Sequence, residues 1–140
     1  MTLIERAIHK MVRNKALNEY NGNSPWEAPT FGVPKKNEGV RNVSDFRKLN
    51  EAIKRNPWSM PTIQDILQQC RGITYATALD MIISYYVMKV REDMRKYLVI
   101  ILPWSKYIYN KMPMGLKIST YFFQRELSMI FKICHTSQCT

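Results

Sequence analysis

The sequence predicts an α+β fold. Two segments, 2–17 and 120–133, carry apolar residues at helical spacing. Between them, a turn at 37–39 separates two short strand-like runs, 31–34 and 40–43, which is the pattern of a β-hairpin. No segment is repeated, and 140 residues make one ordinary domain at most.

The elements of the first half follow from local signals. Thr2 and Glu5 have the spacing of a capping box at the start of the first helix. Residues 18–29 contain Asn, Gly and two prolines, which indicates an extended connector. After the hairpin, Ser44 is expected to cap a short helix over 45–55.

The second half continues the same mixture. Thr62 is expected to begin a helix that Gly72 ends, with an apolar stripe formed by Ile63, Ile66, Leu67 and Cys70. A strand is predicted from Tyr75 to Leu79, so that Asp80 lies at its end. Two further strands, 98–102 and 107–109, flank a turn at 103–106.

Charge indicates a polyanionic partner. Lys and Arg total 21 against 11 Asp and Glu, a net charge of +10, and 46% of the residues are hydrophobic, so the chain is no disordered basic tail. Nucleic acid is the favoured partner, although charge alone also fits an anionic membrane surface.

No apolar run approaches the ~20 residues of a membrane span. The N-terminus mixes charges into the region that a signal peptide keeps apolar. An intracellular protein, cytoplasmic or nuclear and without membrane attachment, is therefore expected.

The cysteines favour a reducing compartment. Cys70, Cys134 and Cys139 are odd in number and form no CxxC pair. Cys134, His135 and Cys139 could suggest zinc, but three potential ligands without a fourth favour a chance arrangement.

Six ordered blocks carry a family resemblance: SPWEAPTFGVPKK, VRNVSDFRKLN, MPTIQDIL, YATALD, ILPWSKYIYNKMPMGL and FFQREL. In this order and at these intervals the chain resembles the reverse transcriptases of gypsy-like LTR retrotransposons over about residues 1–131. The resemblance implies a right-hand polymerase fold, with fingers from 1–55 and 88–118 and a partial palm from 56–87 and 119–140. It also implies that the rest of the palm, the thumb and the RNase H region of the Pol polyprotein are missing.

The chemistry implied by this family is the extension of a primer on an RNA or DNA template, with two Mg²⁺ or Mn²⁺ ions holding the reacting oxygens. Asp80 matches the first catalytic, metal-binding aspartate. The other carboxylates of the family belong to a Y-x-D-D hairpin, and no adjacent Asp pair occurs here. The chain alone is therefore expected to be inactive. Asp45 is expected to form a structural ion pair with Arg47.

The resemblance also implies a site for the incoming dNTP. Lys35, Lys36 and Arg41 match basic residues that contact the triphosphate, Tyr85 matches an aromatic gate against a ribose 2′ hydroxyl, and Met114 matches a pocket residue. Without the resemblance, the hairpin would be interpreted as a solvated basic surface and Tyr85 as a core aromatic.

Some residues depart from the family pattern. Ile83-Ser84 replaces a small Ser-Gly pair, and Ile118 and Thr120 replace Asn and Pro. Two alternatives to a polymerase fragment therefore stay open: a non-catalytic basic nucleic-acid-binding remnant and a pseudogene product.

Overall fold

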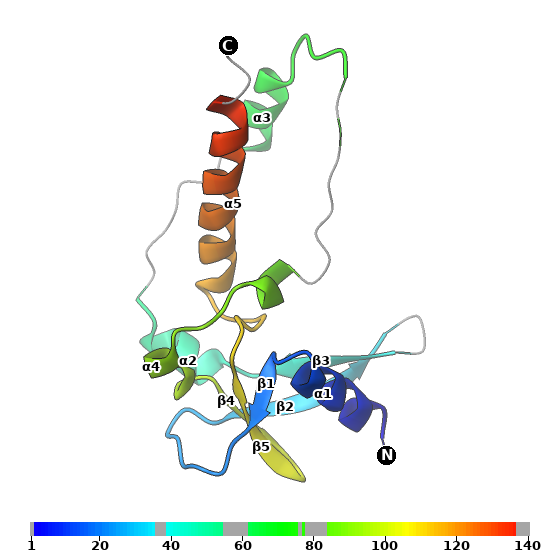
Figure 1. Ribbon diagram of the computed structural model, residues 1–140, viewed down its shortest axis with the longest axis vertical. Coiled ribbons are helices and arrows are strands. Elements are labelled where there is room, and N and C mark those ends of the chain that lie inside the picture. The colour runs from blue at the N-terminus through cyan, green and yellow to red at the C-terminus, as the bar shows by residue number, and fades with distance from the viewer. Residues whose placement is uncertain (1, 36–38, 55–61, 76, 78–83, 137–140) are drawn as a thin grey trace.

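The computed structural model describes residues 2–35, 39–54, 62–75, 77 and 84–136. A sheet with α1 on it forms the lower body in Figure 1, and α3 and α5 extend above it. The strands are β1 (Leu17–Glu19), β2 (Ala28–Pro34), β3 (Val40–Ser44), β4 (Val99–Leu102) and β5 (Ser105–Tyr109). The helices are α1 (Leu3–Arg13), α2 (Arg47–Ala52), α3 (Ile63–Gln69), α4 (Glu92–Arg95), α5 (Ser119–Thr136) and a 3₁₀ turn, η1 (Ser84–Val87).

The five strands form one sheet in the order β1-β5-β4-β2-β3. All neighbours are antiparallel except β2 and β4, which run parallel with Ala28 opposite Ile100. The predicted hairpin is present, with Thr30 opposite Ser44 and Pro34 opposite Val40. In this order β3 lies at one edge of the sheet, so its side chains can contact residues that lie beside the sheet.

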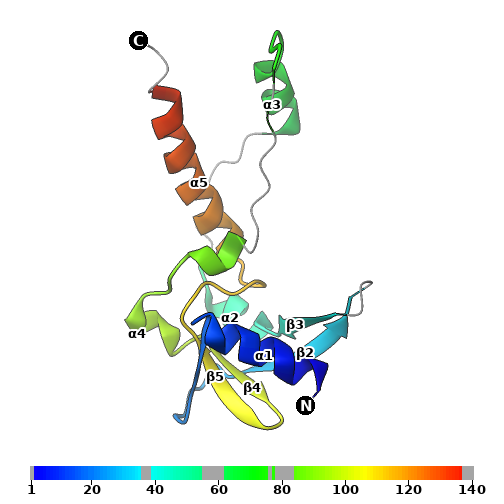
Figure 2. The ribbon, with the colours of Figure 1, turned by 45° about the vertical axis from the view of Figure 1, so that its right-hand side comes forward.

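The first helix lies on the sheet as its amphipathic pattern requires (Figure 2). The predicted capping box is confirmed, because Thr2 and Glu5 each accept a hydrogen bond from the other's backbone N–H. Ile8 is only 1% exposed and joins a core that includes Leu17, Ile100, Tyr107 and Tyr109. Apolar burial of this kind is the main force holding α1 in place.

The prediction for Ser44 is wrong. Ser44 ends β3, and α2 begins after Phe46, whose side chain makes no capping hydrogen bond. The Ser44 hydroxyl instead accepts a hydrogen bond from Thr30 Oγ1 at 2.8 Å, across the hairpin. The backbone N–H of Arg47 donates to Asp45 at 3.1 Å, so Asp45 takes over part of the capping.

The second predicted helix forms, and the apolar stripe expected on it is exposed. Thr62 and Asp65 form a capping box, and Gly72 follows the helix with φ +84°. Ile63 and Leu67 are 77% and 63% exposed. The predicted strand from Tyr75 to Leu79 and the catalytic candidate Asp80 lie wholly or mostly outside the described residues. Among the described residues, no helix has the length and apolarity that crossing a bilayer requires.

Candidate functional site

The basic hairpin formed by β2 and β3 holds two of the predicted phosphate-binding residues. Arg41 lies opposite Val33, and the backbone N–H of Lys35 donates to Gly39 across the turn at 2.7 Å. Both Lys35 and Arg41 are exposed. Lys36 lies outside the described residues.

Arg41 meets Met114 although 73 residues separate them in the chain. Its Nη2 lies 3.8 Å from the Met114 sulfur. The two residues border a small cavity of about 90 Å³, which is also lined by Asn42, Val43, Ser44, Tyr86, Tyr109 and Gly115. The structure therefore brings together two of the predicted nucleotide-site residues, from the hairpin and from the MPMGL block.

The loop that carries Met114 is held in place from both sides. Asn50 of α2 donates to the Gly115 carbonyl at 2.8 Å and accepts from the Lys117 N–H at 2.9 Å. On the other side, the buried hydroxyl of Ser119 donates to the Pro113 carbonyl at 2.7 Å. Gly115 has φ +93°, a conformation that other residues rarely adopt. These contacts and the conformation of Gly115 hold the sharp turn of the backbone between β5 and α5.

A chain of hydroxyl groups lies behind Arg41. Thr30 donates to Ser44, and Ser44 lies 3.5 Å from the Tyr109 hydroxyl. The rings of Tyr109 and Tyr86 stack with centroids 6.5 Å apart.

Burial raises the pKa of both Tyr86 and Tyr109, and the positive charge of Arg41 offsets only part of the rise for Tyr86. Both phenols are consequently neutral near pH 7 and available as hydrogen-bonding groups.

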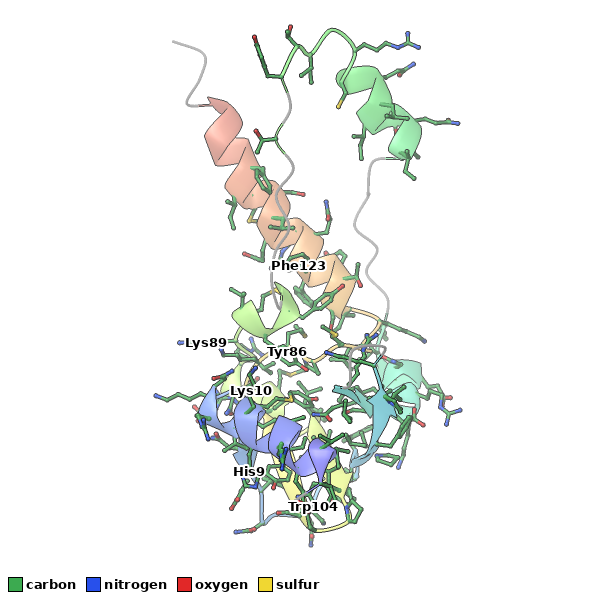
Figure 3. The ribbon with its side chains drawn as sticks, turned by 90° about the vertical axis from the view of Figure 1, so that its right-hand side faces the viewer. His9, Lys10, Tyr86, Lys89, Trp104 and Phe123 are labelled. Carbon is green, nitrogen blue, oxygen red and sulfur yellow. The ribbon has the colours of Figure 1, made fainter. Side chains whose placement is uncertain are left out.

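Tyr85, the predicted sugar gate, faces a different way from Tyr86. Its hydroxyl lies 3.3 Å from Thr120 Oγ1, and its ring centroid is 5.4 Å from that of Phe123 on α5. Tyr85 does not line the Arg41–Met114 cavity, whereas its neighbour Tyr86 does. Figure 3 labels Tyr86 just above the α1 body and Phe123 farther up on α5.

Comparisons with known proteins identify the family of this chain. Residues 33–140 match the family described as reverse transcriptase (RNA-dependent DNA polymerase). The chain belongs to the reverse transcriptase family.

Relatives of this reverse transcriptase chain are retrotransposon polyproteins. It is 32% identical over 102 residues to the transposon Tf2-7 polyprotein of Schizosaccharomyces pombe, covering 73% of this chain and 8% of that protein. It is 27% identical over 141 residues to the retrovirus-related Pol polyprotein from transposon 297 of Drosophila melanogaster, covering 97% of this chain and 13% of that one. The chain thus spans a small part of these relatives.

The fold is that of solved reverse transcriptases. The protease-reverse transcriptase of prototype foamy virus superposes with a TM-score of 0.80 at 21% identity, covering 93% of this chain and 17% of the viral one. A foamy viral protease-reverse transcriptase in complex with dsDNA gives a TM-score of 0.76 at 17% identity, covering 92% of this chain and 27% of that one. The predicted α+β polymerase fold is confirmed.

The aspartates that the structure of this reverse transcriptase describes are all engaged locally. Asp45 forms an ion pair with Arg47 at 2.6 Å, and Asp93 forms one with Arg91 at 2.6 Å. The arginines hold the pKa of each carboxyl below its ordinary value, and hydrogen bonds from Thr62 do the same for Asp65.

Reverse transcriptases use divalent metal ions. Within the described part of the chain, no group of three or more His, Cys, Asp or Glu side chains is placed to hold a metal ion. Those residues therefore do not fit a metal site by themselves, and the only predicted metal ligand, Asp80, lies outside them.

Two features of the site are not predicted by the sequence patterns. Asn50 holds the Met114 loop, and its place after Arg47-Lys48-Leu49 gives no local signal of that contact. Phe31 and Val33 are 52% and 39% exposed. Gly32 between them faces Ile4 of α1, so alternation puts both side chains on the opposite side of the hairpin, the side of Arg41. Phe31, an aromatic residue in the predicted strand, is the sequence signal for this exposed apolar side of the hairpin.

Proposed function

We propose that this chain supplies the dNTP-binding part of an RNA-directed DNA polymerase. In this proposal, Arg41 contacts the triphosphate of the incoming dNTP, and Lys35 and Lys36 add charge from the same hairpin. Met114 packs against the base and sugar. The observation that carries the proposal is the contact between Arg41 and Met114, because it joins two motifs that lie far apart in the sequence.

The surroundings of Arg41 suit an anion. Its one polar contact among the described residues is the weak one to the Met114 sulfur, so the guanidinium donors remain available. A guanidinium can donate two parallel hydrogen bonds to phosphate oxygens. The neutral hydroxyls of Tyr86 and Tyr109 lie behind it and add no competing negative charge.

We further propose that Tyr85 limits the space around the sugar. Its contacts with Thr120 and Phe123 fix the ring between η1 and α5. Because the Tyr85 ring is held from one side, its other edge is fixed where a nucleotide would bind. A ribose 2′ hydroxyl would need the space next to that edge. Thr120 replaces the proline of the family pattern, so this chain uses a hydroxyl partner there.

The division of the chain follows from the same proposal. Fingers come from 1–55 and 88–118, and a partial palm comes from 56–87 and 119–140. A template with its primer, RNA or DNA, is the proposed partner, with a net charge of +10 favouring it. Asp80 would bind Mg²⁺ or Mn²⁺ together with carboxylates that this chain lacks.

Binding of nucleic acid without catalysis is a second candidate function, because no adjacent pair of aspartates occurs in the sequence. A basic chain without the paired carboxylates could bind nucleic acid and catalyse nothing. The two functions separate when the missing palm hairpin and thumb are supplied by fusion to those parts of a related gypsy-like enzyme. A polymerase gains dNTP-dependent extension in the fusion, whereas a mere binder does not.

The test of the nucleotide site is steady-state extension by that fusion protein with Arg41→Ala. The loss of one charge-assisted contact, about 1.5–3 kcal/mol, should lower kcat/KM for dNTP by roughly ten- to a hundredfold. Arg71→Ala is the matched control, since Arg71 is exposed and follows α3. If Arg41→Ala weakens template binding and leaves dNTP kinetics unchanged, the assignment is wrong.

A further inference from the structure

A large apolar groove lies where α2, α4 and the first turns of α5 meet. Its volume is about 890 Å³, within the range of roughly 300–1,000 Å³ that small-molecule sites occupy. Aromatic and aliphatic side chains from separate elements line it, among them Trp26, Leu49, Ile53, Tyr97, Leu116 and Phe122. None of the described residues that line this groove also lines the Arg41–Met114 cavity, so the groove is a site of its own.

Three methionines make the walls of the groove adaptable. Met88, Met94 and Met112 line it beside the rings and aliphatic side chains. A methionine side chain is unbranched and polarizable, so it can follow the shape of an irregular or flexible ligand. The groove therefore suits a hydrocarbon body of small-molecule size.

The charged residues of the groove are mostly positive. Lys89, Arg91 and Arg125 line it, against the single carboxylate of Glu126 among the described residues. Arg91 is already paired with Asp93 at 2.6 Å. Lys89 is exposed and forms no ion pair in the part of the chain that the structure describes. A negative charge on a ligand is therefore attracted here and a positive charge is repelled.

Arg125 has a hydrogen-bond donor that is left over. Arg47 donates to both oxygens of Asp45, from Nε at 2.9 Å and from Nη2 at 2.6 Å. Arg125 instead donates only from Nη2, to Glu126 at 3.0 Å, and its Nε is buried without a hydrogen-bond partner among the described residues. A buried donor without an acceptor is unfavourable, and a carboxylate oxygen is the acceptor that suits a guanidinium best.

The packing of Arg125 lets a ligand in the groove reach this donor. Its guanidinium carbon lies 5.1 Å from the ring centroid of Phe122, which lines the groove. The Arg125 side chain is 35% exposed, so neighbouring atoms do not enclose it completely. A small turn of the side chain on the Phe122 ring can bring the Nε–H to the open side of the groove.

We propose that this groove binds a free apolar carboxylate, a small molecule with a hydrocarbon body and one carboxylate group. The hydrocarbon packs against the aromatic, aliphatic and methionine side chains, and the carboxylate accepts a hydrogen bond from Arg125 Nε near the charge of Lys89. A neutral hydrocarbon would leave the buried Nε–H without an acceptor. The site goes beyond the proposed nucleotide function and does not depend on it.

The test is equilibrium binding of cis-parinaric acid to the whole chain, followed by the rise of its fluorescence in an apolar site. The methyl ester of the same acid is the matched probe, because it keeps the hydrocarbon and lacks the charge. Both are used below the concentrations at which they aggregate. The acid should bind the wild type about tenfold more tightly than the ester, the low end for a charge-assisted hydrogen bond because Arg125 is partly exposed. Equal affinities would overturn the proposal.

Arg125→Met removes the charge and keeps an apolar stem. The ratio of acid to ester affinity should fall from about ten to about one. Because the ratio compares two probes on one protein, a loss of folded protein leaves it unchanged. Arg71→Met is the matched control, since Arg71 is exposed and does not line the groove, and it should keep the wild-type ratio. An unchanged ratio in Arg125→Met would refute the role of Arg125.

Glu126→Gln should act in the opposite direction. It removes the carboxylate that competes for Arg125, so the acid should bind roughly 1.5- to 5-fold more tightly, with the ester unchanged. Glu92→Gln makes the same change of net charge at an exposed residue of α4 that does not line the groove, and it should have no effect. An equal gain in both variants would show that net charge alone governs binding, against the proposal.

Two further variants locate the bound acid. Ala52→Trp places a large ring in the groove and should weaken both probes, whereas Ile63→Ser with Leu67→Ser, on the exposed stripe of α3, should change neither. The reverse result would place the acid on α3 and refute the proposal. Sedimentation equilibrium tests a second copy of the chain as the occupant. A dimer that Ala52→Trp dissociates and cis-parinaric acid does not would show that a second copy fills the groove, and the proposal would fail.

Discussion

Removing the Asn50 side chain should loosen the loop that carries Met114. Asn50→Ala deletes two hydrogen bonds, the donation to Gly115 at 2.8 Å and the acceptance from Lys117 at 2.9 Å. Each such bond contributes about 0.5–1.5 kcal/mol net. Because water can reach this region, we expect the lower part of the sum, about 1–2 kcal/mol of unfolding free energy.

Urea unfolding followed by circular dichroism measures this loss. With an m value of roughly 2 kcal/mol/M, the midpoint should fall by about 0.5–1 M. Asn23→Ala is the control, since Asn23 is exposed and, among the residues that the structure describes, only its backbone carbonyl takes part in a hydrogen bond. Asn50→Asp should be no better than Asn50→Ala at pH 7, because a carboxylate cannot donate to the Gly115 carbonyl. An Asn50→Ala midpoint equal to that of Asn23→Ala would show that these two bonds do not hold the loop.

Three further predictions concern the ion pair, the sugar and the isolated chain. The Lys106 ammonium, 2.7 Å from Glu27, holds the pKa of that carboxyl below its ordinary value of 4.5. The pair therefore stabilises the fold above that pH, and the contribution is lost as the pH falls through the lowered pKa. Thermal midpoints measured from pH 6 down to pH 3 should fall less steeply in Glu27→Gln than in wild type, and parallel curves would contradict this. In the fusion protein, Tyr85→Ala should admit rNTPs while dNTP use is largely kept, whereas unchanged sugar choice would remove Tyr85 from that role. The chain alone should extend no primer on poly(rA)·oligo(dT) with Mg²⁺ or Mn²⁺, and extension that Asp80→Asn abolishes would refute this.

Local patterns predicted the local elements well. The helix at α1 and the hairpin at β2 and β3 depend on periodicity, a capping box and a turn, all of which act between near neighbours. The strand β1 was missed because it has three residues and forms only by pairing Leu17 with Tyr109, 92 positions later. Ser44 was misjudged for the same reason: its hydroxyl bonds across the sheet to Thr30 rather than along the chain to a helix.

The candidate site could not be derived from spacing. Nothing local relates Arg41 to Met114 or Asn50 to Gly115, since those contacts are made by the tertiary fold. The resemblance of the ordered motifs indicates these residues, because it carries long-range information that periodicity lacks. The difference between Tyr85 and Tyr86 illustrates the limit, because adjacent tyrosines in a 3₁₀ turn point in different directions and only the structure separates them.

We propose above all that this chain supplies the first catalytic carboxylate and the nucleotide site of a reverse transcriptase. Primer extension by the fusion protein, measured with and without Asp80→Asn, tests it most directly. We expect dNTP-dependent extension with Asp80 present and none with Asp80→Asn, at equal affinity for the template and primer. A folded fusion protein that binds template and extends nothing, or one that stays active with Asp80→Asn, would contradict the claim.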